Sequence, residues 1–421
     1  MTITRRRVLG TGAAVAAALA APAAIGQARP RVAVIGGGAG GATAARYIAK
    51  DSKGAIDVTL IEPTRKYYTC FFSNLYIGGF RDYASIGHDY TTLASEFGVN
   101  VVHDWATGID RDAKSVALAS GSAVPYDRLV VSPGIDFRWE SVPGYSLAAQ
   151  NAMPHAWKAG SQTALLRAQV DAMPEGGTFV MVAPPNPYRC PPGPYERVSM
   201  IAHRLKQTNP TAKILVIDPK EKFSKQALFM EGWEEHYAGM VEWMPFSEHG
   251  GIERVDPETM EIATAFDSVT ADAANVIPGQ KAGHIAESAG LTDASGWCPI
   301  MPATMQSRMD ADVHVLGDAT IAGDMPKSGY SANSQAKAAA MAIRAELTGA
   351  KAFPPRYSNT CWSLISPENG VKVGARYEPT EEKIAKTSGF ISETGETADM
   401  RRQTYEESLG WYSGITSDMF G

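Results

Sequence analysis

The sequence lacks the closely spaced cysteines from which many redox and metal-binding proteins are recognised. Only four cysteines occur among 421 residues, namely Cys70, Cys190, Cys298 and Cys361. None lies in a C-x-x-C motif, so neither a thioredoxin-type active site nor a local zinc site is predicted, and we predict no metal site at all. None lies in C-x-x-C-H, so no c-type haem is expected on this chain. Four cysteines allow three full disulfide pairings, and their spacing does not choose among them.

The chain also lacks an excess of positive charge. It contains 39 lysine and arginine residues against 45 acidic residues, which gives a net charge of −6. Arg5, Arg6 and Arg7 precede a segment of mostly alanine and glycine, Val8–Ile25. Gly26-Gln27-Ala28 then supplies the small residues of a cleavage site, so residues 1–28 are predicted to be a twin-arginine export signal. An uncleaved membrane anchor is the alternative interpretation of this segment.

Export and cleavage would change the character of the chain. Removal of residues 1–28 deletes three arginines and no acid, so the net charge moves from −6 to −9. Such an acidic chain argues against nucleic acid as a partner. No other apolar run approaches the length of a membrane-spanning helix, so we expect no stable membrane insertion. We expect a periplasmic protein, in a compartment where disulfides are common.

A glycine-rich loop follows the first apolar run of this mature chain. The run Arg31–Ile35 is predicted to be a strand, and the next strand, Val58–Ile61, ends at Glu62. Between them lie three glycines with G-x-G-x-x-G spacing: Gly36, Gly38 and Gly41. The first permits a tight turn, the second lets the backbone approach a pyrophosphate, and the third lets helix and strand pack closely. Glu62, about 20 positions further on, is placed to bind a ribose hydroxyl. This pattern predicts dinucleotide binding.

A second glycine loop is missing. The strand Thr178–Val182, the helix Glu196–Lys206 and the strand Lys213–Ile217 predict a second βαβ unit. In flavoenzymes with two nucleotide domains, an NAD-binding glycine loop follows the first strand of this unit. Here residues 183–194 are rich in proline, which has no N–H and cannot supply backbone donors to a pyrophosphate. The fold is therefore expected to remain without a working NAD site.

Further signals lie towards the C-terminus. The apolar run His314–Leu316 ends at Gly317 and Asp318, and in flavoproteins such an aspartate binds a ribityl hydroxyl of FAD. A helix is predicted over Ser331–Leu347 with Ser331 as its N-cap. Two strands and a helix are predicted in the tail: Asn359–Ile365, Val371–Tyr377 and Arg401–Tyr412.

Over essentially all of residues 31–421, the chain resembles the flavoprotein subunit of flavocytochrome c sulfide dehydrogenase. The resemblance is most specific in Tyr68–Cys70, Arg189–Arg197, Gly296–Pro299, Pro326–Gln335 and Asn359–Cys361. It implies a glutathione-reductase-like α/β fold with two Rossmann-like dinucleotide-binding domains and a C-terminal α+β domain. We expect an FAD-binding domain in 29–145 and 283–348, a second Rossmann-like domain in 146–282, and a C-terminal interface domain in 349–421.

The resemblance also implies roles for the cysteines. By itself, Cys70 is more typical of a buried structural cysteine. In the family, however, the counterpart of Cys70 is bonded through sulfur to the 8α-methyl group of FAD. The counterparts of Cys190 and Cys361 form a redox-active disulfide beside the flavin. Hydrosulfide is expected to attack this disulfide, giving a persulfide and a thiolate, with the thiolate on Cys361. Glu196 is a candidate proton acceptor.

The remaining predicted positions concern the cofactor and the partner. The residues expected to hold FAD are Gly36, Gly38, Gly41, Glu62, Cys70, Gly317, Asp318, Lys327, Tyr330 and Trp411. A c-type cytochrome subunit is the expected partner in a heterodimer, because this chain has no haem motif of its own. A sulfide:quinone oxidoreductase is the alternative, although the polar tail after Thr380 shows no clear membrane-facing side. A non-catalytic flavin electron-transfer protein is a further alternative, should the cysteines lie too far apart to be bridged.

Overall fold

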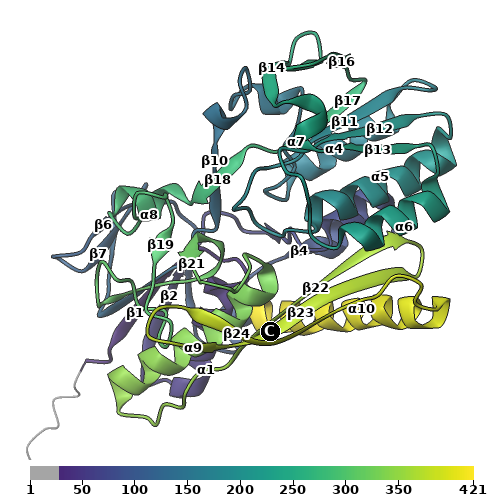
Figure 1. Cartoon of the computed structure of the whole chain (residues 1–421). Coiled ribbons are helices and arrows are strands. Elements are labelled where there is room, and N and C mark those ends of the chain that lie inside the picture. The colour runs from purple at the N-terminus through teal and green to yellow at the C-terminus, as the bar shows by residue number, and fades with distance from the viewer. Residues whose placement is uncertain (1–27) are drawn as a thin grey trace, which may run out of the picture.

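Two parallel sheets and one antiparallel sheet dominate the described part of the chain, residues 28–421 of a computed structural model. The predicted export signal lies outside these residues, apart from Ala28. The first parallel sheet has the strand order β20-β9-β1-β2-β5. Its strands are β1 (Arg31–Ile35), β2 (Asp57–Ile61), β5 (Asn100–Val102), β9 (Arg128–Val131) and β20 (Val313–Val315). Helices α1 (Gly41–Ser52) and α9 (Gly329–Thr348) contact each other beside this sheet (Figure 1).

The second parallel sheet confirms the predicted second βαβ unit. Its order is β13-β12-β11-β17, and its strands are β11 (Thr178–Val182), β12 (Lys213–Ile217), β13 (Val241–Met244) and β17 (Ala273–Val276). Helices α4 (Ser161–Asp171), α5 (Gly193–Thr208) and α6 (Gln226–Tyr237) accompany it (Figure 1). Helix α5 begins three residues before its predicted start at Glu196. The proline after Gly193 is tolerated there because the first turn of a helix has no partner for its N–H groups.

The chain passes between the two parallel sheets twice. Strand β10 (Ile135–Arg138) leads towards the second sheet, and β18 (Gly279–Ala282) leads back. The two strands pair antiparallel, with Ile135 opposite Ala282 and Arg138 opposite Gly279. The first sheet therefore draws its last strand, β20, from a segment far from the others in sequence.

The C-terminal part forms an antiparallel sheet of β22 (Tyr357–Ser366), β23 (Asn369–Pro379) and β24 (Ile384–Ile391), followed by helix α10 (Ala398–Phe420). Strand β22 contacts both α5 and α9, and α10 contacts β23 and α1. In Figure 1 this yellow region runs along one side of the molecule, past the helices of both parallel sheets. The two predicted strands and the predicted helix are confirmed, each longer than expected. Strand β24 was not predicted, because six of its eight residues are exposed and show no alternating pattern.

One predicted helix cap is wrong. Helix α9 begins at Gly329, and its N-cap is Ser328, whose Oγ accepts a hydrogen bond of 3.0 Å from the Ser331 N–H. Ser331 therefore lies inside the first turn. The helix ends at Thr348, and its C-cap Gly349 has a φ of 69°, a conformation that favours glycine at a helix end.

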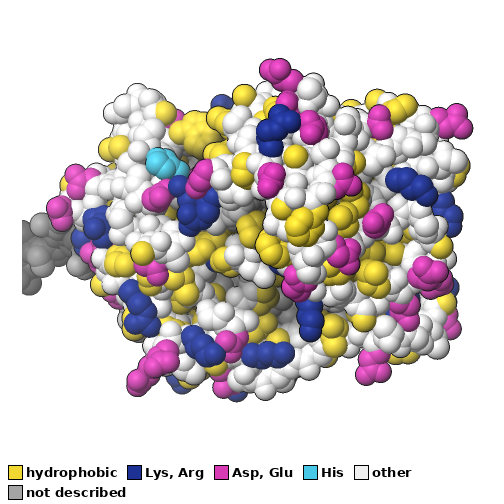
Figure 2. All heavy atoms as spheres, turned by 45° about the horizontal axis from the view of Figure 1, so that its top comes forward, with side chains coloured by type: hydrophobic (Ala, Val, Ile, Leu, Met, Phe, Trp, Pro, Cys, Tyr) yellow, Lys and Arg dark blue, Asp and Glu magenta, His cyan; other side chains and the backbone are white. Residues whose placement is uncertain are grey.

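Smaller elements surround these sheets. The strands are β3 (Tyr67–Tyr68), β4 (Gly87–His88), β6 (Ala106–Asp110), β7 (Ser115–Leu118), β8 (Ala123–Pro125), β14 (Ile252–Asp256), β15 (Glu261–Thr264), β16 (Ser268–Thr270), β19 (Cys298–Pro299) and β21 (Thr320–Ile321). The short helices are α2 (Ser73–Gly78), α3 (Thr91–Ser95), α7 (Phe246–His249) and α8 (His284–Ser288). On the face shown in Figure 2, acidic and basic side chains are interspersed, and hydrophobic side chains surround a hollow near its middle. Within residues 28–421, none of the helices combines the length and apolar character that a bilayer crossing requires.

Alanine is predicted to have opposite effects on stability at two glycines, one in β23 and one in α10. A Cβ on Gly370 would lie 2.6 Å from the backbone N of Tyr405, whereas a Cβ on Gly410, within α10, would meet no atom within 4 Å. We expect Gly370→Ala to lower the free energy of unfolding by about 1–3 kcal/mol through overpacking. Gly410→Ala should raise it by roughly 0.5–1 kcal/mol through helix propensity. Urea titration monitored by circular dichroism measures both, and equal changes in the two variants would contradict this account of the contact.

Candidate active site

The predicted glycine loop is tightly fitted between β1 and α1. Gly36 has a φ of 95°, and a Cβ there would lie 2.3 Å from the carbonyl oxygen of Ser132. A Cβ on Gly41 would lie 1.8 Å from the carbonyl oxygen of Gly36. Only glycine fits both positions. Because α1 begins at Gly41, the N-terminus of this helix faces the loop, as a dinucleotide pyrophosphate requires.

Glu62 is held against this loop. Its Oε2 accepts a 2.8 Å hydrogen bond from the Gly37 N–H, and its Oε1 accepts bonds from both the N–H and the hydroxyl of Thr64. Each carboxylate oxygen has two acceptor sites, so a ribose hydroxyl could still bind. The predicted acid therefore lies beside the glycine loop.

Asp318 has the features of a ligand for a hydroxyl group. It lies directly after β20, next to Gly317, which has a φ of 73°. Its Oδ2 lies 3.7 Å from Nη1 of Arg189, while its Oδ1 is buried and receives no hydrogen bond from residues 28–421. Burial raises the pKa of Asp318, and the charge of Arg189 opposes this shift. Buried acceptors normally receive a hydrogen bond, and a ribityl hydroxyl of FAD would donate one to Asp318 Oδ1. The residues present thus fit FAD.

Tyr67 connects the glycine loop with the rest of the site. Its hydroxyl would be 3.1 Å from a Cβ on Gly38. Burial raises its pKa, and negative charge on Cys70, Glu62 or Asp318 raises it further. These acids and Cys70 come from different segments, so the ring lies among the predicted FAD-binding residues.

The side chain of Lys327 lies beside Trp297 and the Asp318–Thr320 backbone. Its Nζ donates to the carbonyl oxygens of Asp318 (2.9 Å) and Thr320 (2.7 Å) and lies 3.6 Å from the centre of the Trp297 ring. Burial lowers its pKa to about 8. Its backbone has a second role, because the Lys327 carbonyl oxygen accepts the N–H of Cys190 at 2.8 Å.

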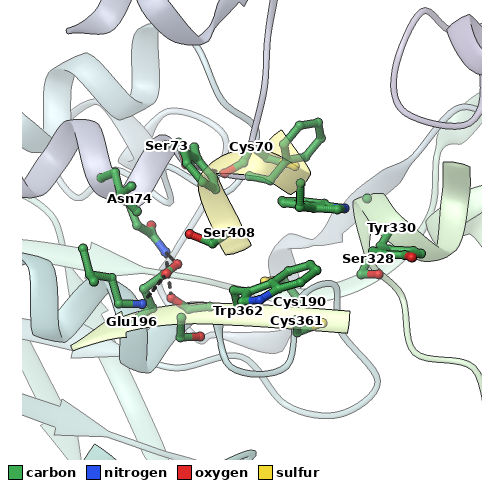
Figure 3. Close-up of a pocket in the computed structure, with 18 of the residues that line it drawn as sticks. Cys70, Ser73, Asn74, Cys190, Glu196, Ser328, Tyr330, Cys361, Trp362 and Ser408 are labelled. Atoms are coloured by element: carbon green, nitrogen blue, oxygen red, sulfur yellow. Dashed lines mark hydrogen bonds between the residues drawn. The ribbon is translucent and has the colours of Figure 1, made fainter. Parts of the chain in front are cut away.

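Six of the predicted site residues line one cavity with about 900 Å³ of empty volume. They are Cys70, Cys190, Glu196, Tyr330, Cys361 and Trp411. Figure 3 shows Cys190 and Cys361 next to each other beneath Trp362, with Cys70 across the cavity. The cavity therefore brings together three cysteines that are far apart in sequence. The fourth, Cys298, is fully buried in β19 and is not among the residues that line it.

Each cavity cysteine is positioned by a different kind of segment. Cys70 lies in the turn between β3 and α2, and Cys361 lies within β22. Cys190 ends the proline-rich loop with a φ of 57°, and its carbonyl oxygen accepts the Gly193 N–H at 2.8 Å, where α5 begins. The four cysteines of the chain are free thiols in the structure.

The two sulfurs near α5 differ in their surroundings. Burial raises the pKa of Cys190 well above its ordinary value, and negative charge on Cys361, Glu196 or Cys70 adds to this. Burial also raises the pKa of Cys361, but three neighbours oppose that shift. One is Asn359, whose Nδ2 donates to Cys361 Sγ at 3.4 Å and whose Oδ1 accepts the Ser328 hydroxyl at 2.6 Å. The other two are the charge of Lys225 and the hydroxyl of Ser328.

Glu196 joins three elements at the cavity wall. It lies in the first turn of α5, and its Oε2 accepts the Asn74 amide of α2 at 2.8 Å. Its Oε1 accepts the Leu364 N–H of β22 at 3.0 Å (Figure 3). Burial raises its pKa, so this carboxyl group binds a proton more readily than an exposed one.

Aromatic rings form another wall. Trp411 of α10 lies nearly parallel to Tyr330, with ring centres 6.2 Å apart and an interplanar angle of 3°. Its ring centre is 5.4 Å from that of Trp362 and 5.5 Å from that of Phe71. Trp411 and Tyr330 are thus placed where a flat ring system could bind.

Several residues of the site were not recognised from the sequence. Trp362 adjoins Cys361 and could have been found from that neighbour. Arg197 is buried and donates to Asn74 and Asn275, but a single arginine within a helical pattern carries no such signal. Lys225, just before α6, carried none either, because its proximity to Cys361 depends on the tertiary fold.

Comparison with known proteins agrees with this geometry. Residues 30–171 match the family described as pyridine nucleotide-disulphide oxidoreductase. Residues 163–278 match the central part of the sulfide dehydrogenase (flavocytochrome c) flavoprotein chain, and residues 353–420 match the flavocytochrome c sulphide dehydrogenase flavin-binding family.

Fold and site thus define a flavin-binding oxidoreductase with two Rossmann-like domains, as expected. The flavoprotein chain of sulfide dehydrogenase (flavocytochrome c) from Chlorobaculum thiosulfatiphilum is 52% identical over 44 residues, which are 10% of this chain and 90% of that sequence. The chain belongs to the family of flavocytochrome c sulfide dehydrogenase flavoprotein chains.

More distant relatives are sulfide:quinone oxidoreductases. The mitochondrial enzyme of Mus musculus is 21% identical over 311 residues, 69% of this chain and 65% of that protein. The Aquifex aeolicus sulfide-quinone reductase is 34% identical over 105 residues, 24% of either chain. A solved sulfide:quinone oxidoreductase from Aquifex aeolicus superposes with a TM-score of 0.68 at 17% identity, covering 92% of both chains. The matches to these curated sulfide:quinone enzymes thus span a quarter to two thirds of their length.

Proposed function

We propose that this protein oxidises hydrogen sulfide at a Cys190–Cys361 disulfide and passes the electrons through FAD to a c-type cytochrome subunit. The observation that carries the proposal is the convergence of Cys70, Cys190 and Cys361 on one cavity, from segments more than a hundred residues apart. Membership of the sulfide dehydrogenase flavoprotein family supports sulfide as the substrate and a cytochrome as the partner. The acidic sequence after the predicted export signal fits a periplasmic heterodimer.

The residues proposed to hold FAD come from several segments of the chain. The glycine loop and Glu62 would bind the nucleotide part, Asp318 would accept a bond from a ribityl hydroxyl, and Tyr330 with Trp411 would enclose the ring system. Cys70 would form the 8α-thioether bond that attaches the cofactor. When bound, FAD would supply a carrier that can accept two electrons and release them one at a time.

The protein's own chemistry is thiol–disulfide exchange. Hydrosulfide attacks one sulfur of the disulfide, a new S–S bond forms, the Cys190–Cys361 bond breaks, and the second cysteine leaves as a thiolate. The cavity is lined by buried and half-buried groups, which limits competing reactions with water. Glu196, with its raised pKa, is proposed to accept the proton when hydrogen sulfide enters as the neutral molecule.

Replacing one member of the cysteine pair tests the disulfide. We expect Cys190→Ser to reduce the rate of flavin reduction by sulfide at least about 100-fold, since no disulfide is left to attack. Cys298→Ala is the matched control, because it removes a buried cysteine outside the cavity. Anaerobic stopped-flow absorbance of the flavin measures both variants. An undiminished rate in Cys190→Ser would refute the disulfide mechanism.

The covalent bond has a separate test. After denaturation in acid, flavin should remain with the wild-type protein, whereas Cys70→Ser should release its flavin into the supernatant because the attaching sulfur is gone. Absorbance of the two fractions at the flavin maximum is the measurement. Release from the wild-type protein would refute the attachment but not the disulfide chemistry.

A sulfide:quinone oxidoreductase is the second candidate, favoured by the similar fold of the Aquifex aeolicus enzyme. Steady-state assays with sulfide distinguish the two. We expect reduction of a c-type cytochrome, and little or no reduction of a soluble ubiquinone analogue by the same preparation. Turnover with the quinone and none with the cytochrome would favour the second candidate.

A further inference from the structure

Lys225 is a buried lysine that reaches the strand carrying Cys361. Its side chain enters from the residue before α6, where the backbone has a φ of 62°, and only 5% of the residue is exposed. Its Nζ donates to the Ser363 hydroxyl at 2.8 Å and to the Cys361 carbonyl oxygen at 3.2 Å, and it lies 3.4 Å from the Val371 carbonyl oxygen. The ammonium group is thus held by backbone and side-chain oxygens of β22 and β23, next to the main chain of Cys361.

The buried charge of Lys225 is not neutralised by a carboxylate in contact. None of the ion pairs within residues 28–421 includes this lysine, and its three hydrogen-bond acceptors are uncharged. A buried ammonium without a counter-charge is costly, and burial lowers its pKa to about 8. The negative charges that act most strongly in the opposite direction are a thiolate at Cys361 and the carboxylate of Glu196.

We propose that Lys225 is a positioning residue that acts through Cys361, holding negative charge on that sulfur so that hydrosulfide attacks Cys190 and Cys361 departs. This inference rests on the proposed redox disulfide and adds the residue that sets the direction in which it opens. Asn359 supports the same outcome, because its amide donates to Cys361 Sγ. The negative charge of Glu196 disfavours a thiolate on either sulfur, but the Cys190 side also has Cys70 as a negative neighbour, with Arg189 as the opposing cation.

The exchange balances as follows. The hydrosulfide sulfur forms a bond to Cys190 Sγ, the Cys190–Cys361 bond breaks, and its electron pair leaves on Cys361 Sγ. The products are a Cys190 persulfide and a Cys361 thiolate, so one negative charge is present before and after the step. In thiol–disulfide exchange the sulfur that better carries the charge leaves faster, which gives the direction proposed here.

The pH dependence of Cys361 involves more groups than Lys225. The titratable or polar groups that influence it from the surrounding elements are Glu196 of α5, Cys190 of the proline-rich loop, Tyr377 of β23, Ser328 before α9 and Asn359 of β22. Lys225 adds a positive charge to these groups. Replacing it removes that charge while the other groups remain.

The first test measures the reactivity of Cys361 in the FAD-containing protein, reduced anaerobically with dithiothreitol. The rate of Cys361 alkylation by iodoacetamide, followed by peptide mass spectrometry over a range of pH, reports its thiolate. In Lys225→Met the alkylation midpoint should rise by about one pH unit or more, a roughly tenfold lower rate on the acidic side. Ser363→Ala removes a partner of the lysine but retains the charge, so its midpoint should stay near that of the wild type, and Lys225→Arg should restore most of the wild-type behaviour.

An unchanged midpoint in a folded, flavin-loaded Lys225→Met would overturn the proposal, as would an equal shift in Ser363→Ala. If Lys225→Met does not fold, the unaltered protein still tests the direction of opening that the proposal requires. Brief exposure of the oxidised wild type to cysteamine, followed by N-ethylmaleimide, should place the maleimide on Cys361 and the cysteamine on Cys190. The reverse pattern overturns the proposal. Failure of the proposed function would instead be seen as the absence of a Cys190–Cys361 disulfide, or as no flavin reduction by sulfide, and these results are separate from the alkylation midpoint.

Discussion

The packing of β22 between α5 and α9 is the contact on which the candidate active site depends. It brings Cys361 to the cavity that Cys190 also lines, and it places the Leu364 N–H where Glu196 can accept it. Glu196 also binds Asn74, next to the segment of Cys70, so one carboxyl group joins the parts that supply all three cavity cysteines. A shift of β22 along its length by one residue would turn Cys361 to the other face of the sheet, because side chains alternate along a strand.

The second Rossmann-like domain keeps its fold but has no glycine loop for a nucleotide. Its strand, turn and helix remain, but prolines occupy the turn that would bind a pyrophosphate, and Cys190 ends it in a left-handed conformation. The loop thus presents a sulfur at the position where related folds present backbone N–H groups to a nucleotide. This arrangement agrees with the proposed entry of electrons from a small substrate at that sulfur.

The electrostatic character of the cavity follows from burial. Cys190, Cys361 and Glu196 are shielded from water, so these three groups hold their protons more tightly than exposed groups would. Lys225 and Arg197 oppose this by supplying buried positive charge. The cavity therefore suits a small anionic nucleophile, and we propose that Lys225, bonded to the Cys361 carbonyl oxygen, gives the two sulfurs different roles.

The sequence by itself determined the local structure: the strands Arg31–Ile35, Thr178–Val182 and Lys213–Ile217 were predicted with their observed bounds. Apolar periodicity and turn residues act between near neighbours, which is why these elements and the glycine loop could be predicted. The resemblance to a known family, and not any local pattern, singled out Cys70, Cys190 and Cys361. Only the tertiary structure decided that Ser328 caps α9, that Lys327 points towards Trp297, and that Lys225 lies behind Cys361. These features depend on contacts between residues far apart in the chain, and local periodicity carries no information about such contacts.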